Sequence, residues 1–169
     1  MKRVGVLLSI VVVLLCGGIA RQAAPVTLAQ EATPAAESIP PLLQAWADAW
    51  SSGDPAQVAA LYAEDGVYEE VPTGVVAQGT DEIETFVGDT FAAFSNVQVT
   101  PRTGFQADEW AVMEADFSGE SAEGRDFSIP FIVVFELDGD RIARNADYFD
   151  LSSLTAQLEP PAAEATPAA

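Results

Sequence analysis

The chain has 169 residues, 49% of them hydrophobic, and 26 acidic residues against seven basic ones give it a formal net charge of −19. This length allows one domain with a substantial apolar core. The acidic balance disfavours nucleic acid and anionic lipid surfaces as partners, because both attract positive charge. Histidine is absent and cysteine occurs only at Cys16, so Ser/His/Asp catalytic sets and the usual zinc sites are excluded.

Residues 1–29 have the three parts of a secretory signal peptide: a basic start, an apolar run up to Cys16 and a small-residue exit. The apolar run is shorter than the roughly 20 residues of a membrane span. We therefore expect export with cleavage after Ala29, and cleavage after Ala20 is the alternative. A retained N-terminal anchor and lipidation of Cys16 stay open, although Leu15 is not the small residue that lipoprotein cleavage requires.

Residues 30–38 and 159–169 are rich in Ala, Glu, Thr and Pro and have no periodic apolar face. Such segments are typical of a flexible linker and a disordered tail. The folded domain is then predicted to span residues 39–158. Without the signal peptide it has four arginines and no lysine to set against the acidic residues, a balance that keeps an exported protein soluble.

Two short helices are predicted at the start of the domain. Ser38 is the expected cap of the first helix, which ends at Gly53. Asp54 is the expected cap of the second helix, with Pro55 in its first position. The first helix carries an apolar stripe at helical spacing, formed by Leu42, Leu43, Trp46 and Trp50.

A strand over residues 67–71 follows, and its two faces conflict. Val67, Glu69 and Val71 share one face, whereas Tyr68 and Glu70 share the other. If hydrophobicity alone decides, the valines are buried, and Tyr68 and Glu70 lie outside.

A loop with Gly74 and Gly79 leads to a third helix, which Thr80 is expected to cap and which ends at Ser95–Asn96. Strands are then predicted over residues 97–106, 110–118, 126–137 and 141–151, with a short helix over 152–158. Apolar residues occupy both faces of the 126–137 strand, which predicts burial on both sides. Helices followed by antiparallel strands indicate an α+β fold with helices on one side of a sheet.

Two stretches carry a family resemblance. The first runs from Trp46 to the sequence Leu-Tyr-Ala-Glu-Asp-Gly-Val-Tyr68, and the second is Asp147-Tyr-Phe-Asp150 followed by Gln157-Leu158. Together they resemble the NTF2-like superfamily, and in particular its SnoaL-like branch of polyketide cyclase-like proteins. The resemblance covers residues 42–158. It implies a cone in which three N-terminal helices pack on a strongly curved antiparallel or mixed sheet and enclose an apolar pocket.

The resemblance also implies acid/base side chains in that pocket. Glu70 matches the general base of ketosteroid isomerases, so the resemblance directs Glu70 and its face neighbour Tyr68 inward. Trp46 stands where those isomerases place a catalytic tyrosine, and Val133 where they keep a protonated aspartic acid. Because both members of that oxyanion hole are missing, steroid isomerase chemistry is not expected.

The last strand supplies two more candidate acid/base groups, Asp147 and Asp150. SnoaL-like cyclases use an aspartate on this strand, and Asp150 is the better match. They also use a histidine, which this chain lacks. Asp150 has a second interpretation as the cap of the following helix. Arg144 shares its strand face and is expected to pair with Asp150 or Glu70, or to lie at the surface.

A small lipophilic molecule is the partner that we expect in the pocket. The candidate catalytic residues are Glu70, Asp150, Asp147 and Tyr68, and the candidate ligand-binding residues are Trp46, Trp50, Tyr62, Phe131, Val133 and Arg144. No cofactor is implied. No metal site is expected either, because the carboxylates of Glu70, Glu114 and Asp116 have no recognisable ligand spacing.

Three functions follow from these observations. The first is an exported domain that binds a lipophilic ligand without catalysis, which agrees with the missing histidine, tyrosine and aspartic acid. The second is an acid/base enzyme acting on a polyketide-like or terpenoid substrate through Glu70 or Asp150. The third is a module that forms a homodimer through its sheet.

Overall fold

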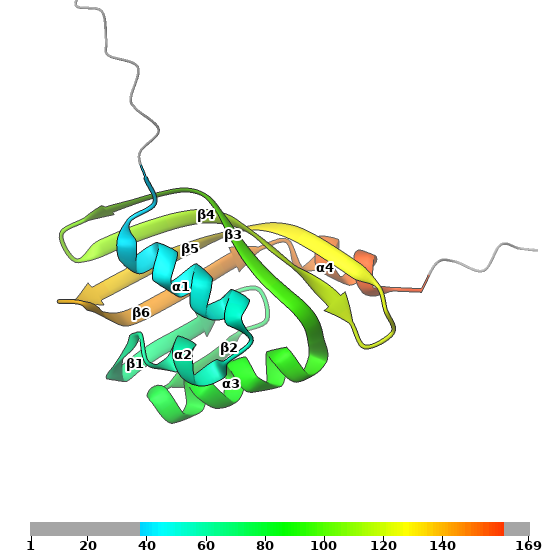
Figure 1. The fold of residues 1–169 in the computed structure, drawn as a ribbon, viewed down its shortest axis with the longest axis horizontal. Coiled ribbons are helices and arrows are strands. Elements are labelled where there is room, and N and C mark those ends of the chain that lie inside the picture. The colour runs from blue at the N-terminus through cyan, green and yellow to red at the C-terminus, as the bar shows by residue number, and fades with distance from the viewer. Residues whose placement is uncertain (1–37, 161–169) are drawn as a thin grey trace, which may run out of the picture. The chain divides into compact units, whose positions relative to one another are not determined.

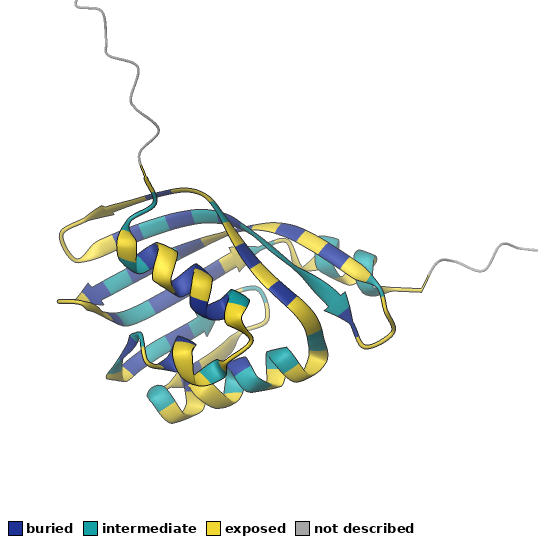
Figure 2. Cartoon of the chain, in the orientation of Figure 1, coloured by how far each residue is buried: buried dark blue, intermediate teal, exposed yellow. Residues whose placement is uncertain are grey.

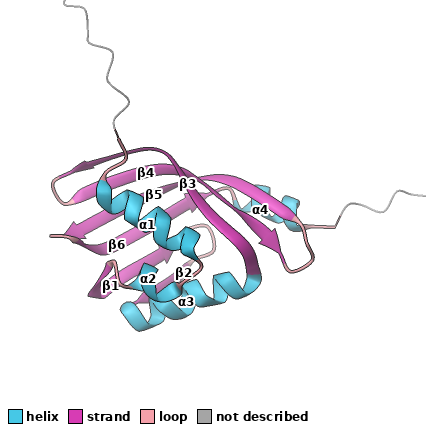
Figure 3. Cartoon of the chain, viewed as in Figure 1, coloured by secondary structure: helices cyan, strands magenta, loops and turns pink. Residues whose placement is uncertain are grey.

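The computed structural model describes residues 38–160. This part of the chain forms four helices and six strands, and Figures 1 and 3 show how they are arranged. The predicted signal peptide, most of the linker and most of the tail lie outside the described residues. Among the residues that the structure describes, no helix is long and apolar enough to cross a membrane. The elements in chain order are α1 (Pro41–Ser52), α2 (Pro55–Ala59), β1 (Tyr62–Glu70), β2 (Val75–Gln78), α3 (Thr80–Ala93), β3 (Phe94–Ala107), β4 (Trp110–Ser121), β5 (Asp126–Asp138), β6 (Arg141–Phe149) and α4 (Leu151–Leu158).

The six strands form one mixed sheet in the order β2-β1-β6-β5-β4-β3. Every neighbouring pair is antiparallel except β1 and β6, which are parallel. The sheet is not closed, and β2 and β3 are its edges. Helices α1, α2 and α3 lie on its concave side (Figure 1). The predicted α+β class, with three helices packed on a curved mixed sheet, is therefore confirmed.

The two N-terminal helices differ in how they begin. The expected cap of α1 at Ser38 is wrong: Pro40 occupies the N-cap position, and no side chain caps the helix. Pro40 has extended backbone angles because it precedes Pro41, and a residue before proline is pushed out of the helical region. Asp54 does cap α2, since its carboxylate accepts a hydrogen bond from the backbone N–H of Ala56 at 3.1 Å.

Several boundaries and one strand differ from the prediction, and Gly79 rather than Thr80 occupies the N-cap position of α3. Strand β1 begins at Tyr62, directly after α2, rather than at Val67. Strand β2 was not predicted, because its four residues follow the Thr73–Gly74 turn and were interpreted as loop. Helix α3 ends at Ala93, so β3 begins three residues earlier than expected.

Strand β5 corrects a further expectation. Its residues alternate between buried and more exposed positions, and Ile132 is 45% exposed. The prediction that both faces are buried is wrong because the described helices α1 to α3 cover only the concave face (Figures 1 and 2). The outer face therefore keeps apolar side chains at the surface.

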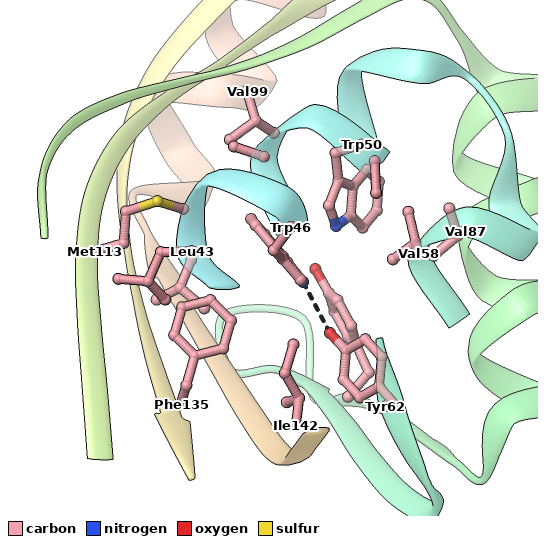
Figure 4. Close-up of a cluster of buried hydrophobic side chains, with 14 of the residues drawn as sticks. Leu43, Trp46, Trp50, Val58, Tyr62, Val87, Val99, Met113, Phe135 and Ile142 are labelled. Atoms are coloured by element: carbon pink, nitrogen blue, oxygen red, sulfur yellow. Dashed lines mark hydrogen bonds between the residues drawn. The ribbon is translucent and has the colours of Figure 1, made fainter. Parts of the chain in front are cut away.

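The core lies between α1 and the concave face of the sheet. Leu43 and Trp46 are almost fully buried against Phe135 and Ile142 (Figure 4). Each such side chain contributes about 1.5–3 kcal/mol by leaving water. Gly104 on β3 permits the close approach of α1, because a Cβ there would lie 3.0 Å from Leu43 Cδ1.

Candidate functional site

A cavity of about 310 Å³ opens between the concave face of the sheet and the helices. Its walls are mainly aromatic, and its polar groups include three carboxylates. The residues that line it are Trp46 and Trp50 from α1; Tyr68 and Glu70 from β1; Phe86, Asp89, Thr90 and Ala93 from α3; Phe94 and Val99 from β3; Phe117 from β4; Ile129 and Phe131 from β5; Asp147 and Phe149 from β6; and Leu154 from α4.

The parallel pairing of β1 with β6 sets the polar end of the cavity. Tyr68 lies opposite Asn145, and Glu70 lies opposite Asp147. These four side chains alternate with outward-facing neighbours along their strands, so they belong to the concave face. Tyr68 and Glu70 thus face inward, as the resemblance implied. The alternative that buries the valines of β1 is wrong.

A chain of hydrogen bonds crosses the floor of the site and ends on Asp147. Trp46 donates its indole N–H to the Tyr62 hydroxyl at 3.0 Å, and this contact is drawn in Figure 4. Tyr62 donates to Asn145 Oδ1 at 2.7 Å, and Asn145 Nδ2 donates to Asp147 Oδ1 at 2.8 Å. Tyr68 donates its hydroxyl to the other carboxyl oxygen of Asp147.

The direction of this chain is fixed by its first member. An indole N–H can only donate, so the Tyr62 hydroxyl oxygen accepts from Trp46 and the Tyr62 O–H is donated to Asn145. The amide of Asn145 is thereby oriented with its NH2 group toward Asp147. Both carboxyl oxygens of Asp147 therefore accept a hydrogen bond, from Asn145 and from Tyr68.

Burial dominates the ionisation of Asp147. The residue is only 5% exposed, and desolvation raises its pKa from the usual value to about 7. Hydrogen bonds from Tyr68 and Asn145 oppose this rise, and the nearby charge of Glu70 adds to it. Asp147 thus changes its protonation state near neutral pH, which is the property required of a group that exchanges protons.

The pKa values of Glu70 and Tyr68, which lie near Asp147, are raised as well. Desolvation raises the pKa of Glu70, while a hydrogen bond from Thr73 Oγ1 at 2.8 Å lowers it. Burial, and then the charge of Asp147, raise the pKa of Tyr68 well above its usual value. Tyr68 is therefore a neutral hydrogen bond donor throughout the physiological range.

Five of the six candidate ligand-binding residues form two groups. Trp46, Trp50 and Phe131 line the cavity. Tyr62 and Val133 are buried but are not part of the lining: Tyr62 belongs to the hydrogen bond chain, and Val133 lies opposite Asp147 in the β5–β6 register.

Arg144 does not line the cavity, so its prediction as a ligand-binding residue is wrong and the alternative of a surface position holds. It lies on the outer face, where it pairs with Glu69 at 2.5 Å and Glu136 at 3.0 Å rather than with Asp150 or Glu70. The strand alternation that directs Asn145 and Asp147 inward directs Arg144 outward.

Asp150 lies outside the cavity and caps α4. Its Oδ1 atom accepts hydrogen bonds from the backbone N–H groups of Ser152 at 2.9 Å and Ser153 at 3.2 Å. The hydrogen bond from the Ser152 hydroxyl, followed by these backbone bonds, lowers the pKa of Asp150, so it stays ionised at neutral pH. The capping interpretation describes Asp150, and the carboxylate of β6 that reaches the cavity is Asp147.

Sequence reasoning missed three features of the site. Asn145, fully buried, orients Asp147, and its position two residues earlier on the same strand face was the available signal. Asp89 on α3 is exposed but reaches the lining. Trp50 is buried with an indole N–H that has no hydrogen bond partner among the described residues.

Charge compensation is missing from the cavity. None of the four arginines in the described residues lines it, and this part of the chain has no lysine or histidine. Within residues 38–160, no group of three or more His, Cys, Asp or Glu side chains has the arrangement of a metal site.

The fold and this pocket define an NTF2-like protein of the SnoaL-like kind. The model of the SnoaL-like domain family matches residues 43–145, and the chain belongs to that family. No curated protein matches the sequence.

Solved structures agree with this assignment. A Catenulispora acidiphila protein with a ketosteroid isomerase-like fold, crystallised in complex with trimethylamine, is 30% identical with a TM-score of 0.68. The match covers 71% of this chain and 93% of that one.

Two more distant structures share the fold. A candidate polyketide cyclase from Xanthomonas campestris is 21% identical, with a TM-score of 0.64 over 70% of this chain and 94% of that one. An epoxide hydrolase from M. tuberculosis, of the LEH-like type, is 21% identical with a TM-score of 0.60 over 69% and 86%.

Proposed function

We propose that this domain binds a small, largely apolar molecule in the cavity, with Asp147 as its principal polar contact. The observation that carries the proposal is the cavity itself, an aromatic hollow of about 310 Å³ with one buried carboxyl on its wall. Its volume lies at the lower end of the range for small-molecule sites, which are typically about 300–1,000 Å³ and mostly apolar. The bound trimethylamine in the Catenulispora acidiphila relative also favours a small occupant.

Binding without catalysis is the primary form of the proposal. Trp46 and Val133 stand where the isomerases of this superfamily have the two groups of their oxyanion hole. Val133 is fully buried and apolar, and the Trp46 indole N–H is already bonded to Tyr62. Neither residue is free to stabilise a developing oxyanion in the cavity.

A titration of intrinsic tryptophan fluorescence tests the binding. Two of the three tryptophans, Trp46 and Trp50, lie in the cavity wall, whereas Trp110 is 52% exposed and is not part of the lining. We expect apolar probes such as tert-butylbenzene to change the emission and to raise the melting temperature. Val99→Trp, which fills the cavity from β3, should abolish both effects, and Val76→Trp on the exposed edge strand is the matched control. No response to any apolar probe of fitting size would contradict the proposal.

A second candidate function is acid/base catalysis by Asp147. The observation that favours it is a pKa of about 7 on a buried carboxyl that Tyr68 and Asn145 hold in one orientation. In this reaction the ionised carboxylate takes a proton from an acidic C–H of the ligand and returns it at another carbon, which isomerises the ligand. Deuterium uptake from D2O into a bound ketone, lost in Asp147→Asn, would support this function over simple binding.

We also propose that the protein is exported, on the strength of the signal-like residues 1–29. Fractionation of cells that express the full chain, with mass spectrometry of the mature N-terminus, tests this proposal. A mature protein beginning at Gln30 is expected. An intact chain in the cytoplasm would contradict it.

Self-association through the outer face of the sheet is a separate proposal. Phe105, Val112, Val134 and Ala146 lie in one register row across β3, β4, β5 and β6, and Phe105 is 58% exposed. We expect a concentration-dependent dimer that Phe105→Glu weakens, measured by light scattering during gel filtration. A monomer at every concentration would exclude it.

A further inference from the structure

We propose that the ligand of this cavity is a small organic cation, an alkyl- or arylammonium compound, held between aromatic rings and the carboxylate of Asp147. This inference rests on the proposed function and names its ligand class. Two observations lead to it. The charged side chains that line the cavity are all acidic, and both carboxyl oxygens of Asp147 accept a hydrogen bond.

The residues that line the cavity include carboxylates but no arginine, lysine or histidine. Glu70 and Asp147 are register partners across β1 and β6, and Asp89 faces the same cavity from α3. Each of the four arginines is occupied elsewhere: Arg102 and Arg144 bind outer-face carboxylates, Arg125 binds Glu123, and Arg141 binds the backbone carbonyl of Ala60. A buried carboxylate without a counter-ion is unfavourable, so a ligand that carries positive charge would gain from entering.

The hydrogen bonds around Asp147 favour its ionised form. Because the chain from Trp46 through Tyr62 to Asn145 has one possible direction, it ends in an N–H donated to Oδ1 of Asp147. Tyr68 donates to Oδ2. Donors on both oxygens stabilise a carboxylate, whereas in a protonated carboxyl the oxygen that carries the proton is a weaker acceptor.

The rest of the wall suits the apolar part of an ammonium compound. Aromatic faces attract cations, and tryptophan and tyrosine attract them most strongly. Trp50 and Tyr68 stand with ring centroids 6.0 Å apart, and Tyr68 and Phe86 stand 4.8 Å apart, so Tyr68 carries both the carboxylate contact and an aromatic surface. Methyl groups on nitrogen would contact these rings, while the charge is directed to Asp147.

An isosteric pair of probes separates charge from shape. Phenyltrimethylammonium and tert-butylbenzene differ only in a nitrogen cation in place of a carbon atom. We expect the cation to bind at least tenfold more tightly in fluorescence and calorimetric titrations at pH 8. Asp147→Asn should remove this preference, because the amide keeps the shape and an oxygen acceptor for Asn145 but lacks the charge. Glu84→Gln, an exposed change on α3 with the same loss of net charge, should leave the preference intact.

The pH dependence provides a second readout. The quaternary probe does not titrate, so any change in its affinity reflects the protein. The titratable groups that act on Asp147 are Tyr68, Glu70 and Tyr62 from β1, and Asp89 from α3 lines the same cavity. Asp147 ionises near pH 7, so affinity should rise between pH 5.5 and pH 8 in the wild type and stay flat in Asp147→Asn.

The outcomes distinguish the inference from the proposed function. If tert-butylbenzene binds as tightly as the cation, the ligand class is wrong and the apolar binding site stands. If neither probe binds and no other apolar compound of fitting size does, both are wrong. A preference for the cation that survives Asp147→Asn would overturn the role of that carboxylate.

Discussion

Glu70 and Asp147 are register partners in the parallel β1–β6 pair, and both carboxylates line the same cavity. Each therefore opposes the ionisation of the other, and the charge of Glu70 is one cause of the raised pKa of Asp147. Glu70→Gln should lower the pKa of Asp147 by a fraction of a pH unit, because desolvation is the larger cause and remains. Carbon-detected NMR titration of the carboxyl groups measures the change, and Glu84→Gln should leave the titration unaltered.

Asp147→Asn should stabilise the protein above neutral pH. In the unfolded chain this aspartate ionises near 3.8, whereas in the folded chain it ionises near 7. Between these values the folded state holds a proton that the unfolded state has lost, so the free energy of unfolding falls as pH rises. Asparagine does not titrate, and the variant should gain about 2 to 4 kcal/mol over the wild type by pH 8.

The pH profile identifies the cause of that gain. Urea unfolding of both proteins at pH 4, 6 and 8 should show the difference between them growing with pH and levelling above pH 7. A difference that is constant across this range would mean that packing, and not ionisation, explains the effect. Asp126→Asn on the exposed start of β5 serves as the control.

Tyr62→Phe should destabilise the domain by about 1–3 kcal/mol. The hydroxyl of Tyr62 is buried and bonds both the indole N–H of Trp46 and the amide oxygen of Asn145. Its loss leaves two buried polar groups without partners. Tyr148→Phe, at a residue that is 46% exposed, removes a hydroxyl in contact with water and should change the unfolding free energy by less than about 0.5 kcal/mol.

Two glycines should respond to alanine in opposite directions. A Cβ at Gly66 would lie 3.0 Å from the backbone oxygens of Ala63 and Ile142, which cannot move without disturbing the β1–β6 contact. Gly66→Ala should cost about 1–3 kcal/mol. Gly88 lies within α3 with nothing nearer than 3.9 Å, so Gly88→Ala should stabilise by about 0.5–1 kcal/mol. Chemical unfolding measures both, and a gain for Gly66→Ala would show that the strand can shift there.

The class of fold was predictable because local signals agreed with it. Asp54 and Gly53 separated two helices, the Asp138–Gly139–Asp140 turn separated two strands, and both features are present in the structure. Strand β2 was not predictable in this way. It has four residues, its Val75 and Val76 are exposed, and it is a strand because β1 lies beside it.

The inward face of β1 shows why the site itself was harder to predict. Alternation alone favours burying Val67 and Val71, but the space inside this sheet contains a cavity, and the more polar face of the strand points into it. Asn145 was missed for a related reason. Its role depends on Tyr62, which is 83 positions away in the chain and which only the β1–β6 pairing brings into contact with it.

Helix α4 closes one side of the cavity with Leu154, yet none of its residues is buried. It is held at its start by the Asp150 cap and near its end by Gln157, whose amide bonds both backbone groups of Ser128 on β5. Segments with so little buried surface open far more readily than the sheet beneath them. Brief detachment of α4 would then let a ligand enter or leave the cavity, and the hydrogen bonds between Gln157 and Ser128 would slow its release.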